Sequence, residues 1–321
     1  YSTLPSWVEE QQLKKAEEFF IDHGPQFLLF LFFKSLPTLY ACQNGAQVLV
    51  RTGRLSERGE NFEKFSRRVA ETGQFLLDVT RPEGIRGAGK GINTAVKVRL
   101  IHASIRQFIG RGDWDGERLG QPINQEDLLI TLMTFSISML EALDVLALEY
   151  TNDEAEAWFH LWRVIGYFMG IREELLPENV SEGKFVLHKI IERQAGRSKA
   201  GKALTDALLE FSQKDAPIDS MKKSSAILMR FLIGDKMANM LDVPVYSGCF
   251  TFLIPRFMKF ILGMVERLED RSEPLHILID KFSQTLTKGM VNYFNQEKQT
   301  HFQIPAGLKG ALGNIAGECY I

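Results

Sequence analysis

Apolar residues recur every three or four positions along most of the chain, which is the period of an amphipathic helix. Between residues 93 and 109 this period places Val98, Ile101, Ile105 and Phe108 on one face. Alternation with a period of two, the pattern of a half-buried strand, is almost absent. The pattern therefore predicts an all-α protein.

The most apolar helix is expected over residues 123–148. Asn124 suits its N-cap, and Glu126 and Asp127 fall in its first turn, where the helix dipole favours anions. The rest of this segment is apolar on nearly every side. We therefore expect it to be a central helix of a large bundle.

Further helices are expected at six places along the chain, at residues 152–170, 184–195, 199–213, 220–241, 251–268 and 274–295. No repeat of fixed period and no Pro/Gly/Ser-rich linker divides the sequence. The patterns predict one large multi-helix domain over residues 45–321, preceded by an N-terminal helical arm over residues 1–44.

The most hydrophobic run of residues is FLLFLFF, residues 27–33. Its length falls far short of the roughly 20 residues that a membrane-spanning helix needs. A buried helix is the favoured interpretation, and a peripheral membrane contact is the alternative. No signal-peptide pattern is present, although the sequence opens at Tyr1, so a leader could be missing.

Composition narrows the class of protein. Hydrophobic residues make up 45% and charged residues 24% of the 321 residues, which is ordinary for a globular protein. The net charge of -2 gives no basic field for nucleic acid. The three cysteines form no CxxC pair, which fits a reducing compartment and predicts a cytoplasmic protein.

The segment GIRGAGKG, residues 84–91, nearly matches the phosphate-binding loop GxxxxGK[ST]. Gly91 stands where the Ser or Thr that binds magnesium should be. Pro82 also makes the preceding segment a poor core strand. We interpret these residues as a flexible loop that leads into a helix.

Two histidines border apolar helical faces, each with an arginine three residues away. Arg99, His102 and Arg106 stack at i, i+3 and i+7 in VRLIHASIR. The aromatic segment EAWFHLWRVIGYFMGI holds His160 and Arg163. A packed core histidine is the common explanation for either one alone. Finding the same pairing twice favours ligands that reach into a dry pocket.

Two such imidazoles with nearby arginines suit a haem, because imidazole binds haem iron and arginine pairs with propionates. Zinc is disfavoured because HExxH is absent, and a serine hydrolase because GxSxG is absent. A di-iron bundle would need paired ExxH motifs. We interpret His23, His276 and His301 as surface residues, and His188 as a reserve ligand.

Several motifs follow one another in a familiar order: VRLIHASIR, GQPINQEDLLITLMTFS, FHLWRVIGYFMGI with EELLP, and GDKMANMLDVP. This order resembles the haem-dependent oxygenase family that includes the rubber oxygenases and the ER-bound oxygenases of mycophenolic acid synthesis. The resemblance covers roughly residues 45–244. It implies a globin-related helical core enclosing a b-type haem, and oxidative cleavage of a carbon–carbon double bond in an isoprenoid-like substrate with dioxygen.

The resemblance also suggests roles for residues. Rubber oxygenases hold iron through a histidine and carry an Arg-x-x-Lys-Thr stretch on the distal side. Arg99 would match that arginine, while His102 and Ala103 replace the lysine and threonine. We assign His160 as the proximal iron ligand, and Arg99 and His102 to distal catalysis, with His102 as a possible distal ligand.

The remaining cofactor contacts are assigned to Arg163, Arg106 and Tyr167. Two other functions stay open: a haem peroxidase on the same scaffold, and a haem-free helical module that binds lipid or protein. The oligomeric state is left open as well.

Overall fold

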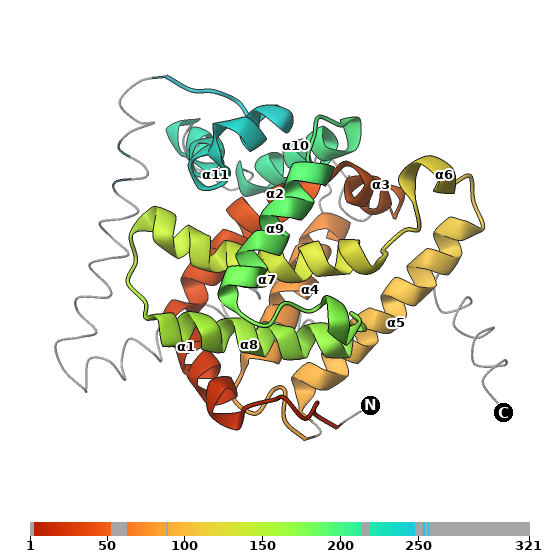
Figure 1. Cartoon of the computed structure of the whole chain (residues 1–321). Helices are drawn as coiled ribbons and strands as arrows, with labels where there is room; N and C mark the ends of the chain where they lie inside the picture. Colours follow the sequence, from red (N-terminus) through yellow and green to blue (C-terminus); the bar gives the residue numbers. More distant parts are fainter. Residues whose placement is uncertain are drawn as a thin grey trace.

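The computed structural model describes residues 3–52, 63–87, 89–213 and 219–247, together with Leu253 and Arg256. These residues form helices and no strand; one isolated bridge joins Cys42 to Ala195. Figure 1 shows the arrangement. The helices are α1 (Glu10–Phe30), the π-helix η1 (Leu31–Ser35), α2 (Leu36–Ala41), α3 (Gln43–Arg51), α4 (Glu63–Thr80), α5 (Lys90–Gly110), α6 (Gly116–Leu119), α7 (Gln125–Leu146), α8 (Asn152–Met169), the 3-10 helix η2 (Glu173–Leu175), α9 (Val180–Gln194), α10 (Lys199–Gln213) and α11 (Asp219–Met240).

The all-α prediction is confirmed for this part of the chain. The expected helices from residue 93 to residue 241 correspond to α5 and α7–α11 within a few residues at each end. The helices expected at 251–268 and 274–295 lie outside the described residues, apart from Leu253 and Arg256.

Helix α7 lies at the centre of the bundle, as its uniform apolar pattern predicted. It packs against α8, α9 and η1, and Figure 1 shows it beside α8 across the middle of the molecule. By length and composition, α7 is the one described helix that could cross a membrane, with a mean hydropathy of 1.7. Because 78% of this apolar stretch is buried inside the protein, we interpret α7 as a core helix.

Helix α1 is not an arm set apart from a domain that begins at Gly45. It packs along α8, and its Phe19 and Phe27 rings lie 6.1 Å and 4.6 Å from the Trp158 ring. The FLLFLFF run continues this helix into η1, and most of its side chains are buried. The correction has a simple cause: an aromatic face of this size is stable only when it shares the core of the other helices.

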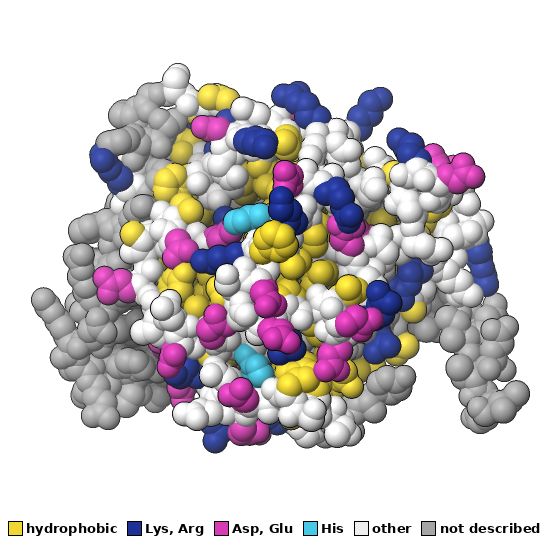
Figure 2. Space-filling model, viewed as in Figure 1, with side chains coloured by type: hydrophobic (Ala, Val, Ile, Leu, Met, Phe, Trp, Pro, Cys, Tyr) yellow, Lys and Arg dark blue, Asp and Glu magenta, His cyan; other side chains and the backbone are white. Residues whose placement is uncertain are grey.

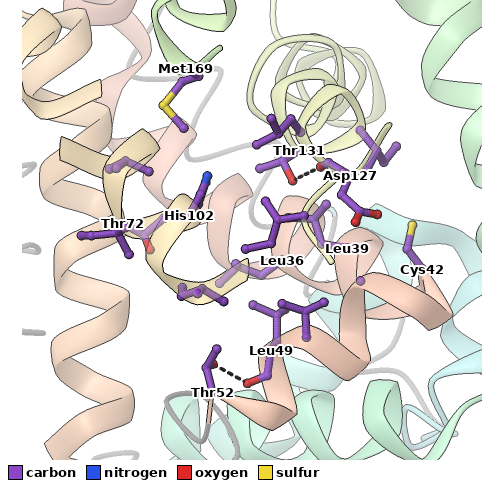
Figure 3. A pocket seen from close by; sticks show the side chains of 18 of the residues that line it. Leu36, Leu39, Cys42, Leu49, Thr52, Thr72, His102, Asp127, Thr131 and Met169 are labelled. Atoms are coloured by element: carbon purple, nitrogen blue, oxygen red, sulfur yellow. Dashed lines mark hydrogen bonds between the residues drawn. The ribbon is translucent and has the colours of Figure 1, made fainter. Parts of the chain in front are cut away.

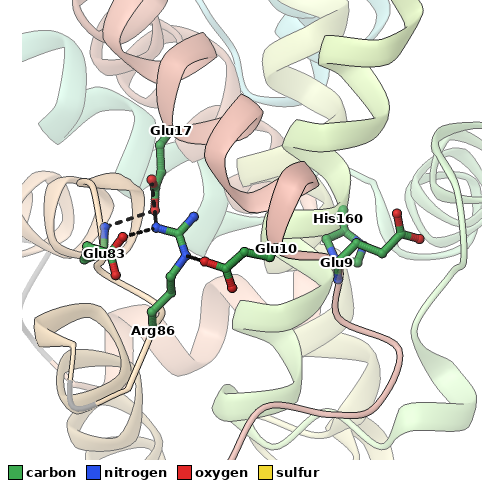
Figure 4. Close-up of polar contacts among 6 residues, drawn as sticks. All are labelled: Glu9, Glu10, Glu17, Glu83, Arg86 and His160. Atoms are coloured by element: carbon green, nitrogen blue, oxygen red, sulfur yellow. Dashed lines mark hydrogen bonds and ion pairs between the residues drawn. The ribbon is translucent and has the colours of Figure 1, made fainter.

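The segment that nearly matches a phosphate loop ties α1 to the connection between α4 and α5. The Arg86 guanidinium lies 2.7 Å from Glu10 and 3.1 Å from Glu17, both on α1 (Figure 4). Lys90, the lysine of the near-match, pairs with Asp78 at 2.8 Å. A helix, α4, precedes this segment instead of the strand that a phosphate loop follows. Its charged residues therefore have structural partners.

Acidic and basic side chains alternate over the face of the molecule seen in Figure 2, without a continuous patch of one sign. This distribution agrees with the small net charge of -2. On this face there is thus no basic stripe of the kind that tracks a phosphate backbone.

Replacing Thr151 with alanine is expected to lower the free energy of unfolding by about 1 kcal/mol. The Thr151 hydroxyl accepts a hydrogen bond from the Glu154 amide at 3.2 Å, and the Glu154 carboxylate accepts one from the Thr151 amide, so the substitution breaks a reciprocal cap of α8. Urea unfolding measures the change. Thr151→Ser keeps the hydroxyl and should retain most of the stability.

Candidate functional site

A cavity of about 210 Å³ lies among α2, α3, α4, α5 and α7 (Figure 3). Aliphatic and aromatic side chains form most of its wall: Leu36, Leu39, Val48, Leu49, Val69, Phe75, Val98, Ile101, Ile105, Ile123, Leu128, Ile130, Phe135 and Met169. The polar groups in this wall belong to Cys42, Thr52, Arg68, Thr72, His102, Asp127, Thr131 and Gln194. An apolar cavity with a few polar groups is the usual form of a small-molecule site.

His102 projects into this cavity from the middle of α5 (Figure 3). The apolar stripe of Val98, Ile101 and Ile105, which the sequence placed beside His102, lines the same wall. The Nδ1 atom of His102 is buried and has no hydrogen-bond partner in the structure. A buried polar atom without a partner is costly, so it points to a ligand.

The His102 ring is neutral at ordinary pH. Loss of water around the ring, with smaller contributions from the positive charges of Arg68 and Arg106, lowers the pKa of His102 to about 3. A neutral imidazole keeps a nitrogen lone pair, which is what a metal ligand requires.

Three other cavity residues carry ionisable groups that sequence analysis did not place in a site. Arg68 reaches the wall from α4, and its Nη1 lies 3.7 Å from the Glu71 carboxylate. Burial raises the pKa of Asp127, although hydrogen bonds from the backbone oppose this effect. Burial also raises the pKa of Cys42 to about 12, so the thiol stays protonated. These three residues meet at the cavity because their helices pack together, and the spacing of apolar residues along the sequence does not predict that packing.

Arg99 and Arg106 do not line the cavity. Arg99 packs against the end of α8, where a Cβ added to Gly170 would lie 2.7 Å from the arginine Nε. Arg106 donates a hydrogen bond to the backbone oxygen of Ile123 at 3.2 Å, and Ile123 itself lines the cavity. The two arginines thus brace the helices around the site.

His160, Arg163 and Tyr167 lie on an outer face of α8, apart from His102. The Glu9 amide donates a hydrogen bond to Nε2 of His160 at 3.0 Å (Figure 4). The Arg163 guanidinium stacks 4.2 Å from the centre of the Trp7 ring, and Tyr167 is 36% exposed. This face packs against the N-terminal segment, so the predicted pairing of His160 with His102 at one site does not occur in the structure.

The remaining histidines show one correction. His23, expected at the surface, is buried against the rings of Phe19 and Phe27 because α1 belongs to the core. His188 is exposed and lies 2.8 Å from the Glu141 carboxylate, away from the cavity. His276 and His301 lie outside the described residues.

The depressed pKa of His102 makes a prediction about stability. Between pH 6.5 and pH 3 the unfolded state binds a proton that the folded ring refuses, so folding is destabilised as the pH falls through this window. Without added cofactor, the wild type should lose on the order of a few kcal/mol of unfolding free energy between pH 7 and pH 4, and His102→Gln should lack this loss. Denaturant unfolding of both proteins at pH 7 and pH 4 measures the difference; parallel pH dependences would contradict the assignment.

Within the described residues, no group of three or more His, Cys, Asp or Glu side chains is placed to hold a metal ion. The neutral imidazole of His102 is a side chain that can supply one bond to a metal whose other ligands come from a cofactor. This donor fits haem, whose iron commonly takes an imidazole as its protein ligand.

Comparison with known proteins identifies the family of the chain. The family model described as "ER-bound oxygenase mpaB/B'/Rubber oxygenase, catalytic domain" matches residues 28–261. The chain is 21% identical over 271 residues to the rubber oxygenase of Streptomyces sp. (strain K30), which covers 82% of this chain. The chain spans 64% of the length of that relative.

Similarity in structure supports the same fold. The solved structure titled "Structure of Latex Clearing Protein LCP in the closed state" matches with a TM-score of 0.70 at 19% identity. The match covers 89% of this chain and 76% of that one. Since the family model covers most of the sequence and the fold agrees, the chain belongs to the oxygenase family of the ER-bound oxygenases mpaB/B' and the rubber oxygenases.

Proposed function

We propose that the protein is a haem b-dependent oxygenase that attacks a carbon–carbon double bond in an apolar, isoprenoid-like substrate, with His102 as the protein ligand to the iron. One observation carries the proposal: a neutral imidazole with an unpartnered Nδ1 faces an apolar cavity in a member of an oxygenase family. Bound haem would supply the chemistry that activates dioxygen, which an apolar pocket of protein side chains does not provide.

The chain's own residues hold and shield this site. His102 would bind the iron, and the positive charge of Arg68 at the cavity wall suits a propionate group. Phe75, Phe135 and Met169 exclude water and receive the alkene. Haem is held without covalent bonds, because the sequence contains no CxxCH attachment motif.

The assignment moves the iron ligand from His160 to His102. A ligand must present a free lone pair to the cofactor, and Nε2 of His160 already accepts the Glu9 amide hydrogen. Arg106 and Arg99 act by positioning α5 and its neighbours, while Arg163 and Tyr167 belong to the face that carries the N-terminal segment.

The test has two stages. The purified protein is first supplied with haem, and its absorption spectrum is recorded. The loaded protein is then given a terpenoid alkene under oxygen, and oxygen consumption and carbonyl products are measured against the saturated analogue. Oxygen consumption with the alkene but not with the saturated analogue supports the oxygenase. Haem binding with turnover only on added peroxide would favour a peroxidase, and no haem binding would favour a haem-free binding module.

A further inference from the structure

A line of aromatic rings leads from the cavity wall into the bundle. Phe135 and Phe75 line the cavity, and the centre of the Trp162 ring lies 5.0 Å and 6.3 Å from theirs. The next ring, Trp158, lies 5.7 Å from Trp162. Both indoles are almost fully buried. Tryptophan is among the side chains most readily oxidised by one electron, so this arrangement has a redox consequence.

The line continues to the edge of the bundle. The Phe19 ring lies 6.1 Å from Trp158 and 6.2 Å from Tyr150. Tyr150 is partly exposed, and its hydroxyl donates a hydrogen bond to the Asp144 carboxylate at 2.7 Å. Trp162, Trp158 and Tyr150 are the oxidisable rings of this line. Phe135 and Phe75 join the cavity to Trp162, and Phe19 joins Trp158 to Tyr150 near the solvent.

The hydrogen bonds along this line differ in a way that sets a direction. The Trp162 indole N–H is buried and has no acceptor among the described residues, whereas that of Trp158 donates to the backbone oxygen of Ser136 at 3.2 Å. A carbonyl oxygen is a very weak base, so neither oxidised indole can readily lose its proton. Tyr150 has a carboxylate in place to take its proton, and deprotonation stabilises the oxidised ring. An oxidising equivalent that starts at the cavity would therefore end at Tyr150.

We propose that Trp162, Trp158 and Tyr150 form an electron relay that removes oxidising equivalents from the cavity when no alkene is bound. The relay rests on the haem-dependent function proposed above, with hydrogen peroxide as the oxidant. Tyr150 loses one electron to the cavity through Trp158 and Trp162, its O–H bond breaks, and the proton passes to Asp144.

A small one-electron reductant such as ascorbate then returns an electron and a proton to Tyr150. In each cycle Asp144 releases to solvent the proton that it accepted. Two cycles deliver two electrons to the cavity, and with two protons taken up there from solvent they convert one hydrogen peroxide, by cleavage of its O–O bond, into two waters. The relay thereby protects oxidisable cavity residues. Met169 is one such residue, since its thioether lines the cavity and is readily converted to a sulfoxide.

The first experiment treats haem-loaded protein with hydrogen peroxide and a spin trap, without alkene or reductant. Peptide mass spectrometry is expected to find the trap adduct on Tyr150 in the wild type. Trp162→Phe and Trp158→Phe keep aromatic packing and should lose that adduct, while Met169 sulfoxide increases. Asp144→Asn removes only the proton acceptor and should also lose the adduct. Trp7→Phe is the matched control, because Trp7 packs against His160 and Arg163, away from this line, and should behave as wild type.

A second experiment needs no haem, so it separates failure of the relay from failure of the oxygenase proposal. Near-ultraviolet light absorbed by tryptophan, with a cobalt(III) ammine complex as electron acceptor, oxidises the indoles of the haem-free protein. The relay predicts that trap adducts accumulate on Tyr150 in the wild type and are lost in Trp158→Phe and Asp144→Asn. Equal labelling of Tyr150 in the wild type and these variants, in either experiment, would overturn the relay.

Discussion

Replacing His102 with alanine is expected to abolish haem binding and leave the helical fold in place. The substitution removes the imidazole that lines the cavity and that would bind the haem iron. Part of the His102 ring already faces the cavity, and alanine is a strong helix former, so α5 should persist. Haem titration followed by absorption measures binding, and far-ultraviolet circular dichroism measures helix content.

The matched control is His160→Ala. It makes the same substitution on α8, at a ring that contacts Trp7 and Glu9 and does not line the cavity. This variant should bind haem as the wild type does. If His160→Ala lost haem and His102→Ala retained it, the iron ligand would be His160, and the N-terminal segment would have to move to admit the cofactor.

Replacing Trp158 with alanine is expected to lower the free energy of unfolding by about 3–5 kcal/mol, the largest single effect on stability that we predict. The indole is fully buried and contacts Phe19, Phe20 and Phe27 of α1 as well as Trp162. Its removal leaves a large cavity where α1 and α8 meet. Chemical denaturation in urea measures the loss.

Phe185→Ala on α9 provides the comparison, because this phenylalanine is 64% exposed. Its truncation should change the free energy of unfolding by less than about 0.5 kcal/mol. Similar losses in the two variants would mean that α1 is not packed on α8 as a part of the core.

Much of the fold follows from periodicity. A helix that is apolar all round has to be central, and α7 is. Three members of the predicted stripe, Val98, Ile101 and Ile105, line the cavity together with His102. The fourth, Phe108, is 58% exposed near the end of α5, so the stripe identified the inner side of the helix only as far as Ile105. These predictions succeed because the burial of apolar side chains largely decides which side of a helix faces the core.

The placement of His160 shows why apolar neighbours along the sequence are a weak guide. Trp158, Phe159 and Trp162 are buried, yet His160 lies between them on the opposite side of the same helix. Glu156, His160, Arg163 and Tyr167 recur at three- and four-residue spacing, which is itself the signature of a polar face. This polar stripe predicts that His160 lies outside the core.

Other parts of the site depend on tertiary packing. Arg68 on α4 and Asp127 on α7 meet the cavity only because their helices pack around α5. Nothing in the local sequence of either residue distinguishes it from a surface charge or a helix cap. Asp127 indeed serves as part of the cap, since it accepts a hydrogen bond from the Asn124 amide at 3.2 Å.

The most direct test of the account is the absorption spectrum of the purified wild-type protein supplied with haem. The account predicts a Soret band that saturates at one haem per chain and is absent in the His102→Ala variant. A wild-type protein that stays colourless, or a His102→Ala variant with the full wild-type spectrum, would contradict the assignment of this cavity as a haem site.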